Sequence, residues 1–351
     1  MSGAETPATR LFAFVLCPKL SMIAFAAALE PLRIANRLSH ETLYDWRLMT
    51  EDGDVATCSS GTRVAPDGGL LDLPRGATAF VCSGLDAQFA AGKALLTWLR
   101  KQERRGVALG GMCTGSFILA KAGLLEGRRC TIHWENQPAL AEEFPELEVT
   151  NHLFEIDGSR FTCAGGAASA DMMLEIIARD HGQDLASLVA DQLIHAPVRT
   201  GREEQRLSVP ARIGVRHPKL VSIINIMENN LEDPISPSVL AKEAGMSTRQ
   251  LERLFRRYMN RSPKRYYMEL RLDRARNLLL QTDMSVINVA LACGFTSPSH
   301  FSKCYRSYFN NTPYRERGAP RPSDGRPERD AFFDVVDAAE FDDEVAAPPT
   351  G

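Results

Sequence analysis

The chain has 351 residues, enough for two domains at about 150 residues each. Its 44% of hydrophobic residues suits a globular protein, and no apolar stretch is long enough to predict a membrane helix. The eight cysteines form no CxxC pair and the seven histidines are dispersed, so we expect no zinc module, disulfide framework, other metal site or cofactor. Such cysteine usage favours the reducing cytoplasm.

The net charge of −3 hides an uneven distribution along the chain. Residues 212–321 carry 19 Lys and Arg against 9 Asp and Glu, whereas residues 1–211 carry 20 against 26 and residues 322–351 carry 2 against 9. A basic segment inside an otherwise acidic chain favours a polyanion as the partner of that segment alone. Charge by itself is equally compatible with a solvated basic surface.

After a flexible N-terminus (residues 1–9), residues 10–198 alternate β-like apolar runs with helical patterns. This order predicts an α/β domain of the flavodoxin-like type, whose parallel sheet is covered by helices on both faces. The run Leu11–Leu29 would also suit a signal peptide, but Glu30 and Arg33 continue the helix without a cleavage context. The expected strands are Leu11–Leu16, Thr78–Cys82, Gly106–Leu109 and Arg160–Cys163, and the expected helices are Ile23–Leu38, Lys93–Arg105, Cys113–Gly123 and Ala168–His181.

A cysteine with glycines on both sides, Cys113, follows one of these strands and precedes a helix. Such a strand–turn–helix lifts a side chain above the edge of the sheet, as in a nucleophile elbow. The N-terminus of the new helix would favour a thiolate or a bound anion. His133, twenty residues further along the chain, could then form a nucleophile–base pair with Cys113.

A polar, weakly periodic linker (residues 199–211) leads to a helical part, residues 212–318, which repeats itself at an offset of 49–50 residues. Ala241, Ala244, Gly245, Met246 and Ser247 match Ala290, Cys293, Gly294, Phe295 and Thr296. In each copy a short helix of small residues ends at the glycine. A hydroxyl residue then caps a second helix, Ser247 in the first copy and Thr296 or Ser297 in the second. Each copy therefore has the parts of a helix-turn-helix.

The second helix of each copy has an apolar stripe with the period i, i+3, i+4, i+7 and an opposite polar face. The polar faces carry residue types that hydrogen-bond to base edges and phosphates. We therefore expect double-stranded DNA to be bound by Arg249, Gln250, Arg253, Arg256 and Arg257 in the first copy, and by Ser299, His300, Ser302, Lys303 and Arg306 in the second. A solvated face is the alternative for any one of these residues, and the matched second copy argues against it.

Between the copies, Pro263–Gln281 predicts one long helix with proline in its first turn. Its span is about 25–30 Å at about 1.5 Å per residue. Successive major-groove faces on one side of a duplex lie roughly 34 Å apart. Both second helices could therefore reach the same side of the DNA.

Two stretches resemble the AraC/XylS family of regulators, namely Leu240-Ala241…Leu251…Phe255 and Gly294-Phe295…Ser299-His300-Phe301-Ser302…Phe309…Thr312-Pro313…Arg315. The resemblance covers about 100 residues of the chain. It implies a transcription regulator whose partners are promoter DNA and RNA polymerase.

Residues 10–195 resemble the DJ-1/PfpI branch of the class I glutamine-amidotransferase-like superfamily, through the elbow cysteine and the His133-Trp134 pair. Where many relatives place an acidic residue beside that cysteine, this chain has Ala24, which argues against hydrolytic chemistry. We interpret Cys113 as a wall of a ligand pocket. An active cysteine hydrolase and a redox-sensing thiol are the alternatives.

The segment from Ser21 to Ser39 resembles the subgroup that senses quaternary amines or amino-acid derivatives, of which glycine-betaine and carnitine regulators are the best-known members. Aromatic side chains could supply π-faces for a trimethylammonium group, and the amides of the elbow could meet a carboxylate. Glu30 could orient His133. The residues expected at the effector site are Phe25, Glu30, Trp46, Cys113, Thr114, His133 and Trp134. Core packing is the alternative for each aromatic residue.

Together these patterns predict a cytoplasmic transcription regulator, an activator without enzymatic activity, that responds to a small-molecule effector and forms a homodimer through its N-terminal domain. The alternatives are a cysteine amidase or protease fused to a DNA-binding module, a redox-sensing regulator, and a repressor or nucleoid-type protein without an effector. For the acidic, proline-rich end of the chain, residues 319–351, we expect disorder.

Overall fold

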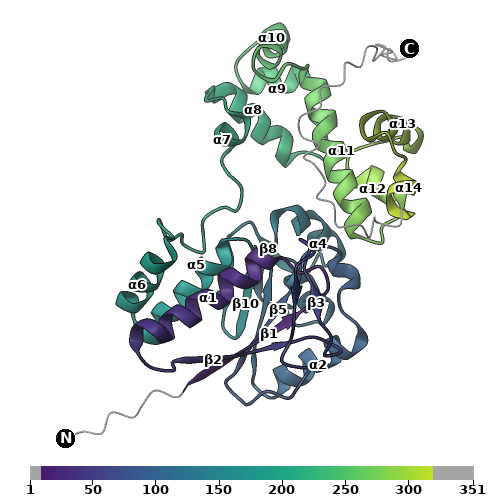
Figure 1. The fold of residues 1–351 in the computed structure, drawn as a ribbon. Coiled ribbons are helices and arrows are strands. Elements are labelled where there is room, and N and C mark those ends of the chain that lie inside the picture. Colours follow the sequence, from purple (N-terminus) through teal and green to yellow (C-terminus); the bar gives the residue numbers. More distant parts are fainter. Residues whose placement is uncertain (1–8, 319–351) are drawn as a thin grey trace, which may run out of the picture. The chain divides into compact units, whose positions relative to one another are not determined.

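The computed structural model of the chain describes residues 9–318 (Figure 1). The chain has an α/β half and an all-helical half, each with two hydrophobic cores, and Ala139 of the α/β half joins one core of the helical half. The flexible N-terminus expected at residues 1–9, apart from Thr9, and the acidic tail expected at residues 319–351 lie outside the described residues. Within residues 9–318, no helix is both long and apolar enough to cross a membrane.

Six strands form the main sheet in the described part of the chain, and five of them run parallel. Their order is β2 (Tyr44–Met49), β1 (Arg10–Leu16), β5 (Thr78–Cys82), β6 (Ala108–Met112), β10 (Arg160–Cys163) and β9 (Phe154–Asp157), the last of which is antiparallel. β5 is buried along its whole length, which is why it is a continuous apolar run without alternation. The predicted α/β fold with a parallel sheet is confirmed.

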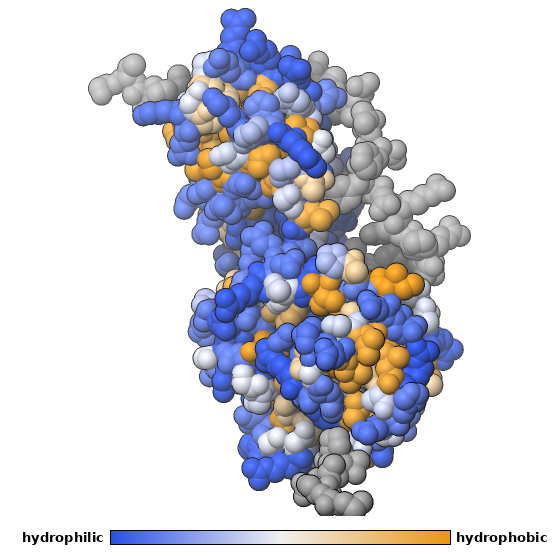
Figure 2. Space-filling model, turned by 90° about the vertical axis from the view of Figure 1, so that its left-hand side faces the viewer, coloured by the Kyte–Doolittle hydropathy of each residue, from blue (hydrophilic) through white to orange (hydrophobic). Residues whose placement is uncertain are grey.

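Successive residues of β1 point to opposite faces of the sheet, so that Phe12 and Phe14 belong to one core and Ala13 and Val15 to the other. On the first face α1 (Met22–Ser39), α5 (Ala168–His181) and α6 (Gln183–Leu193) pack against one another (Figure 1). The second core is completed by α2 (Lys93–Arg104), α3 (Gly115–Lys121) and α4 (Gln137–Glu143). Hydrophilic residues cover most of the surface that Figure 2 shows, and hydrophobic residues are confined to limited areas of it.

Some elements differ from the sequence-based expectation. β2 is not predicted, because its residues alternate between exposed and buried at the edge of the sheet. β6 begins at Ala108, since Gly106 has a φ of +81° and forms a turn. The remaining short elements are β3 (Ala56–Thr57), β4 (Arg63–Val64), β7 (Arg129–Thr131), β8 (Glu148–Thr150) and single 3-10 turns at Ala87–Phe89 and Trp134–Asn136.

The helical half comprises α7 (Val209–Ile213), α8 (Pro218–Asn229), α9 (Pro237–Glu243), α10 (Thr248–Met259), α11 (Pro263–Gln281), α12 (Val286–Ala292), α13 (Pro298–Phe309) and α14 (Pro313–Gly318). α11 has the bounds expected from the sequence. Its first turns pack Tyr266 and Tyr267 into the core of the first copy, and its later turns pack Leu272 and Leu279 into that of the second. α11 therefore joins the two helix-turn-helix units as one continuous element.

Residues 199–206, which we call the connector, are bonded to the α/β half although they fall in the expected linker. Arg199 donates to the buried carboxylate of Asp171 from Nε, Nη2 and its backbone N–H, at 2.6–3.0 Å. The backbone N–H of Leu153 donates to the carbonyl oxygen of Gly201 at 3.0 Å. Gln205 Nε2 donates to the carbonyl oxygen of Ile132 at 2.8 Å, and also to Thr131 Oγ1 and the His152 carbonyl oxygen. The polar residues of the connector thus find their partners far away in the sequence.

Candidate DNA-binding helices and effector site

α10 and α13 both begin with a capped first turn. In α10, Ser247 Oγ accepts from the backbone N–H of Gln250, and Gln250 Oε1 accepts from the backbone N–H of Ser247, which makes a capping box. In α13, Ser297 Oγ accepts from the backbone N–H of His300 at 3.3 Å. The cap predicted at Ser247 is confirmed, and Ser297 is the cap of the second copy.

One face of α10 is buried and the other is exposed. Leu251 and Phe255 lie in the core of the first copy. The exposed residues expected to contact DNA include Arg249, Arg253, Arg256 and Arg257, and none of these arginines forms an ion pair with another described residue. Their guanidinium groups are therefore available to phosphates and base edges. Gln250 is also exposed, but its side-chain oxygen is engaged in the cap of its own helix.

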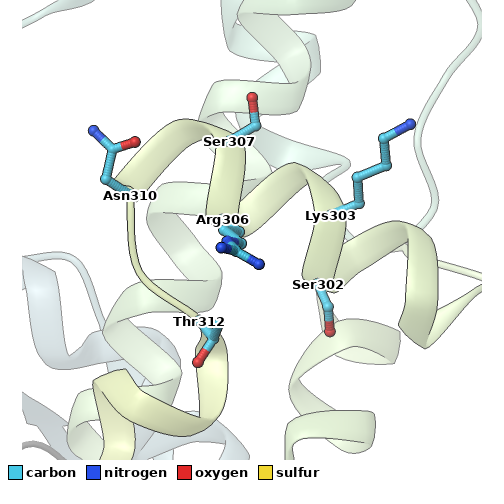
Figure 3. A pocket seen from close by; sticks show the side chains of 6 residues that line it. All are labelled: Ser302, Lys303, Arg306, Ser307, Asn310 and Thr312. Carbon is cyan, nitrogen blue, oxygen red and sulfur yellow. The ribbon is translucent and has the colours of Figure 1, made fainter.

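α13 repeats this arrangement, with Phe301 and Tyr305 buried. Ser299 and His300 are exposed in its first turn, where His300 Nε2 lies 3.3 Å from Cys304 Sγ. A concave surface of about 690 Å³ is lined by Ser302, Lys303, Arg306, Ser307, Asn310 and Thr312 (Figure 3). Three of these residues are among the expected DNA contacts.

The other three lining residues, Ser307, Asn310 and Thr312, are not predicted from the sequence, and the last two lie beyond the end of α13 at Phe309. The internal repeat held a signal for two of them, since Asn310 and Thr312 match Asn260 and Ser262. Both asparagines end their helices in a left-handed conformation, with φ of 51° and 53°. The turn that follows each of these helices is thus part of the repeated structure.

In the α/β half, the elbow lies where β6 ends, between the ends of β5 and β10. Cys113 has a φ of +58°, which is uncommon for a residue with a side chain. Its glycine neighbours are required, because a Cβ atom on Gly115 would overlap the carbonyl oxygen of Val81. The backbone N–H of Cys113 donates to the carbonyl oxygen of Cys163 at 3.0 Å. Contrary to expectation, this amide is therefore not free for a carboxylate.

The thiol of Cys113 is protonated at neutral pH. Burial raises its pKa to about 12, and the backbone N–H of Thr114 offsets only part of that shift. The expectation of a thiolate at this helix N-terminus is wrong, because desolvation outweighs the favourable dipole. Burial also lowers the pKa of His133, whose backbone N–H donates to the Cys113 carbonyl oxygen at 3.3 Å. A neutral thiol and a neutral imidazole do not make the ion pair of a cysteine hydrolase.

The expected role of Glu30 is also wrong. Glu30 Oε2 accepts from Arg33 Nε at 2.8 Å on the surface of α1, as residues three positions apart on a helix do. The carboxylate closest to the His133 ring in the described structure is that of Glu135, with Oε2 3.9 Å from Nδ1. Ala24, at the position where the family resemblance implies an acid, is buried. Among the described residues, no carboxylate is thus hydrogen-bonded to the His133 ring, as the acid of a Cys–His–acid set would be.

The three aromatic residues expected at the effector site lie in different places. Phe25 is buried and packs edge-on against Phe14, with 5.7 Å between ring centroids. Trp46 lies on β2, and the elbow follows β6. Because β1 and β5 lie between these two strands, β2 and β6 are about 14 Å apart at a strand spacing of about 4.8 Å. Trp134 lies next to the elbow, and its ring is covered by the guanidinium of Arg206, 4.5 Å from the ring centroid. No sequence pattern indicated Arg206.

Comparison with known proteins covers both halves of the chain. A family model described as a helix-turn-helix domain matches residues 240–319, and the model of the DJ-1/PfpI family matches residues 27–179. The HTH-type transcriptional regulator CdhR of Pseudomonas aeruginosa is 48% identical over 306 residues, which is 87% of this chain and 91% of that protein.

Two further regulators from Pseudomonas aeruginosa are similar over nearly the same length. GbdR is 45% identical over 304 residues, 87% of this chain and 83% of that protein. ArgR is 38% identical over 308 residues, 88% of this chain and 93% of that protein. The similarity thus spans the sheet, the elbow and both helix-turn-helix units. The chain belongs to the AraC family of transcriptional regulators, among those that join a DJ-1/PfpI domain to the DNA-binding helices.

Proposed function

We propose that this regulator binds a small metabolite in its α/β half and responds by changing how α10 and α13 engage a promoter. The observation that carries the DNA part is the matched pair of capped helices, each with a buried apolar stripe and an exposed basic or polar face. α11 has 19 residues and spans about 28 Å, so one protein molecule can present both helices to one side of a duplex.

The DNA contacts can be tested with one residue from each copy. Arg253 and Lys303 are exposed on equivalent faces of α10 and α13. We expect Arg253→Ala and Lys303→Ala each to weaken operator binding by about 1–3 kcal/mol if the side chain contacts a base, with little effect on unrelated DNA. A phosphate contact would instead weaken binding to all sequences alike.

Gel shifts of the full chain on its own upstream region and on a shuffled duplex separate these outcomes. Lys93→Ala is the matched control, since it removes one exposed positive charge from α2 in the other half. Operator affinity that is unchanged in both test variants, with Lys93→Ala also unchanged, would show that α10 and α13 do not face the DNA.

For the effector we propose a small zwitterion, a quaternary amine or amino-acid derivative such as glycine betaine or carnitine, held beside the elbow. The residues that support this site are Cys113, Thr114, His133 and Trp134, which lie on adjoining segments, whereas Phe25, Glu30 and Trp46 have other partners. A buried, protonated Cys113 suits the wall of a pocket better than a nucleophile. We therefore propose a sensor without enzymatic activity.

We further propose that the protein acts in the cytoplasm as an activator that contacts RNA polymerase, and that it forms a homodimer through its α/β half. Exposed apolar side chains support the dimer: Ile23 on α1 and Leu188 on α6 are both more than half exposed, at 62% and 55%. α1 and α6 pack side by side, so the two residues belong to neighbouring helices. Sedimentation of Leu188→Glu against wild type measures whether this surface supports a dimer.

A further inference from the structure

The connector runs alongside the segment that carries Trp134. Gln205 Nε2 donates to the carbonyl oxygen of Ile132, two residues before Trp134, and the next connector residue places its guanidinium over the Trp134 ring. The backbone N–H of His133, between these two points, donates to the carbonyl oxygen of Cys113. Arg206 thus lies at the rim of the proposed effector site, although 93 positions separate it from Cys113 in the sequence.

Arg206 has unused hydrogen-bonding capacity. Within residues 9–318 its side chain forms no hydrogen bond and no ion pair, and it lies over the face of the indole at 4.5 Å. The charges of Arg212, Glu228 and Glu135 act on it without direct pairing. A guanidinium carries five N–H donors in a planar fork that matches a carboxylate. Contact with an aromatic ring holds such a group in place and removes water from one side of it. Desolvation lowers the pKa of Arg206 and the positive charge of Arg212 adds to that shift, but the exposed guanidinium remains a cation at neutral pH.

The elbow has fewer free hydrogen-bond donors for a carboxylate than Arg206 has. The amide of Cys113 is bonded to the Cys163 carbonyl oxygen at 3.0 Å, and Thr114 Oγ1 donates to the Gly84 carbonyl oxygen at 2.6 Å. Burial keeps His133 neutral. The cation next to Trp134 is therefore the group at this site best suited to an anionic ligand.

We propose that Arg206 is the carboxylate-binding residue of the effector site, and that Trp134 serves as the platform that positions it. This inference rests on the proposed effector site and specifies how the site recognises its ligand. The effector must then carry a carboxylate, and its ammonium end binds to residues other than Arg206. A bound carboxylate would also hold the end of the connector where the chain leaves the α/β half, which gives the ligand a direct route to α7.

Isothermal titration calorimetry of the full chain tests this with three pairs of ligands, in each of which one member lacks the carboxylate. The pairs are glycine betaine and choline, carnitine and carnitine methyl ester, and arginine and agmatine. For the pair that binds, we expect the wild type to prefer the carboxylate by about tenfold or more, the usual contribution of a charge-assisted contact. Arg206→Gln should abolish this preference by weakening the carboxylate ligand alone, and Arg206→Lys should keep part of it.

Arg202→Gln is the control, since Arg202 is an exposed arginine of the same connector with no such contact, and its binding should equal that of the wild type. An Arg206→Gln protein that keeps the wild-type preference overturns the inference and leaves the effector site intact. Tighter binding of glycine betaine to Arg206→Gln also overturns it, because Arg206 would then be a competitor of the ammonium group for Trp134. A wild-type protein that binds none of the six compounds contradicts the proposed effector class itself.

Discussion

Gly245 and Gly294 occupy matching turns of the two helix-turn-helix units, with φ of +60° and +74°. Their surroundings differ. A Cβ atom on Gly294 would lie 2.6 Å from the carbonyl oxygen of Glu232 and 2.8 Å from that of Leu231, whereas one on Gly245 would meet only the end of the Lys219 side chain at 4.0 Å. Backbone strain is common to both positions, and the steric clash is specific to the second.

We therefore expect Gly245→Ala to lower the free energy of unfolding by about 1 kcal/mol, the cost of a left-handed alanine. Gly294→Ala should lower it by about 3 kcal/mol, because two backbone oxygens must also move. Urea unfolding of the two variants and the wild type gives both values. Equal losses of unfolding free energy at the two positions would mean that the loop before α9 moves away from the added Cβ atom at little cost.

Cys113 provides a second test at the level of a single residue. A thiol with a pKa near 12 contains almost no thiolate at pH 7–8, so iodoacetamide should leave Cys113 unmodified in the folded chain and modify it after unfolding in urea. Reactivity should appear only as the pH approaches that raised pKa. Mass spectrometry of the peptide that contains Cys113 measures the modification.

The same interpretation predicts that Cys113→Ser keeps effector-dependent transcription in a reporter assay. A folded Cys113→Ser protein that has lost induction, or rapid alkylation of native Cys113 at pH 7, would favour the redox or hydrolase alternatives.

Among the elements, the connector depends on one buried ion pair. The Asp171 side chain is fully buried, and both its oxygens accept from Arg199, while His195 Nε2 lies 2.7 Å from Oδ1. A buried carboxylate is stabilising only while its partners remain, since desolvation of the charge is costly. This pair therefore holds the start of the connector against α5.

Asp171→Asn should lower the free energy of unfolding by about 2–3 kcal/mol, at the low end for a broken buried pair because Arg199 is a third exposed and can regain water. Glu175→Gln is the matched control on the same helix: it removes an exposed pair with Arg179 and should cost less than about 0.5 kcal/mol. Thermal unfolding of both variants measures the difference. A control that destabilises as much as Asp171→Asn would mean that burial of the carboxylate is unimportant.

For the whole molecule, the distribution of charge matters more than its sum. The chain has a net charge of −3, yet residues 212–321 have ten more basic than acidic residues. Because ions screen charges beyond about 8–10 Å, DNA responds to the local surface of α10 and α13 and not to the acidic remainder. Residues 212–318 also supply all the buried members of two hydrophobic cores except Ala139 and Val209, so we expect this part to fold alone.

We expect DNA affinity to fall steeply with salt, by about 10³-fold or more between 50 and 200 mM if six or more phosphates are contacted. The segment 212–318 should show the same dependence as the full chain, because it contains all the proposed contacts. Gel shifts across that salt range on the natural upstream region measure both. Binding that is independent of salt, or a segment that folds but does not bind, would contradict the assignment of the DNA-binding surface.

The amino-acid sequence by itself determined the alternation of β1, β5, β6 and β10 with α1, α2, α3 and α5, the bounds of α11, the glycine turns and the cap at Ser247. These features depend on residues within a few positions of one another, where periodicity, φ preference and capping operate. The internal repeat strengthened these predictions, because the same turn and cap pattern occurs at matching positions of two copies.

Tertiary structure decided everything that depends on distant partners. The state of the Cys113 thiol follows from its burial, and Glu30 pairs with Arg33 and not with His133. Trp46 lies three strands from the elbow cysteine, while Arg206 reaches Trp134 across 72 positions of sequence. Burial and long-range contacts set the pKa values and the available donors of the effector site, and no local pattern encodes them.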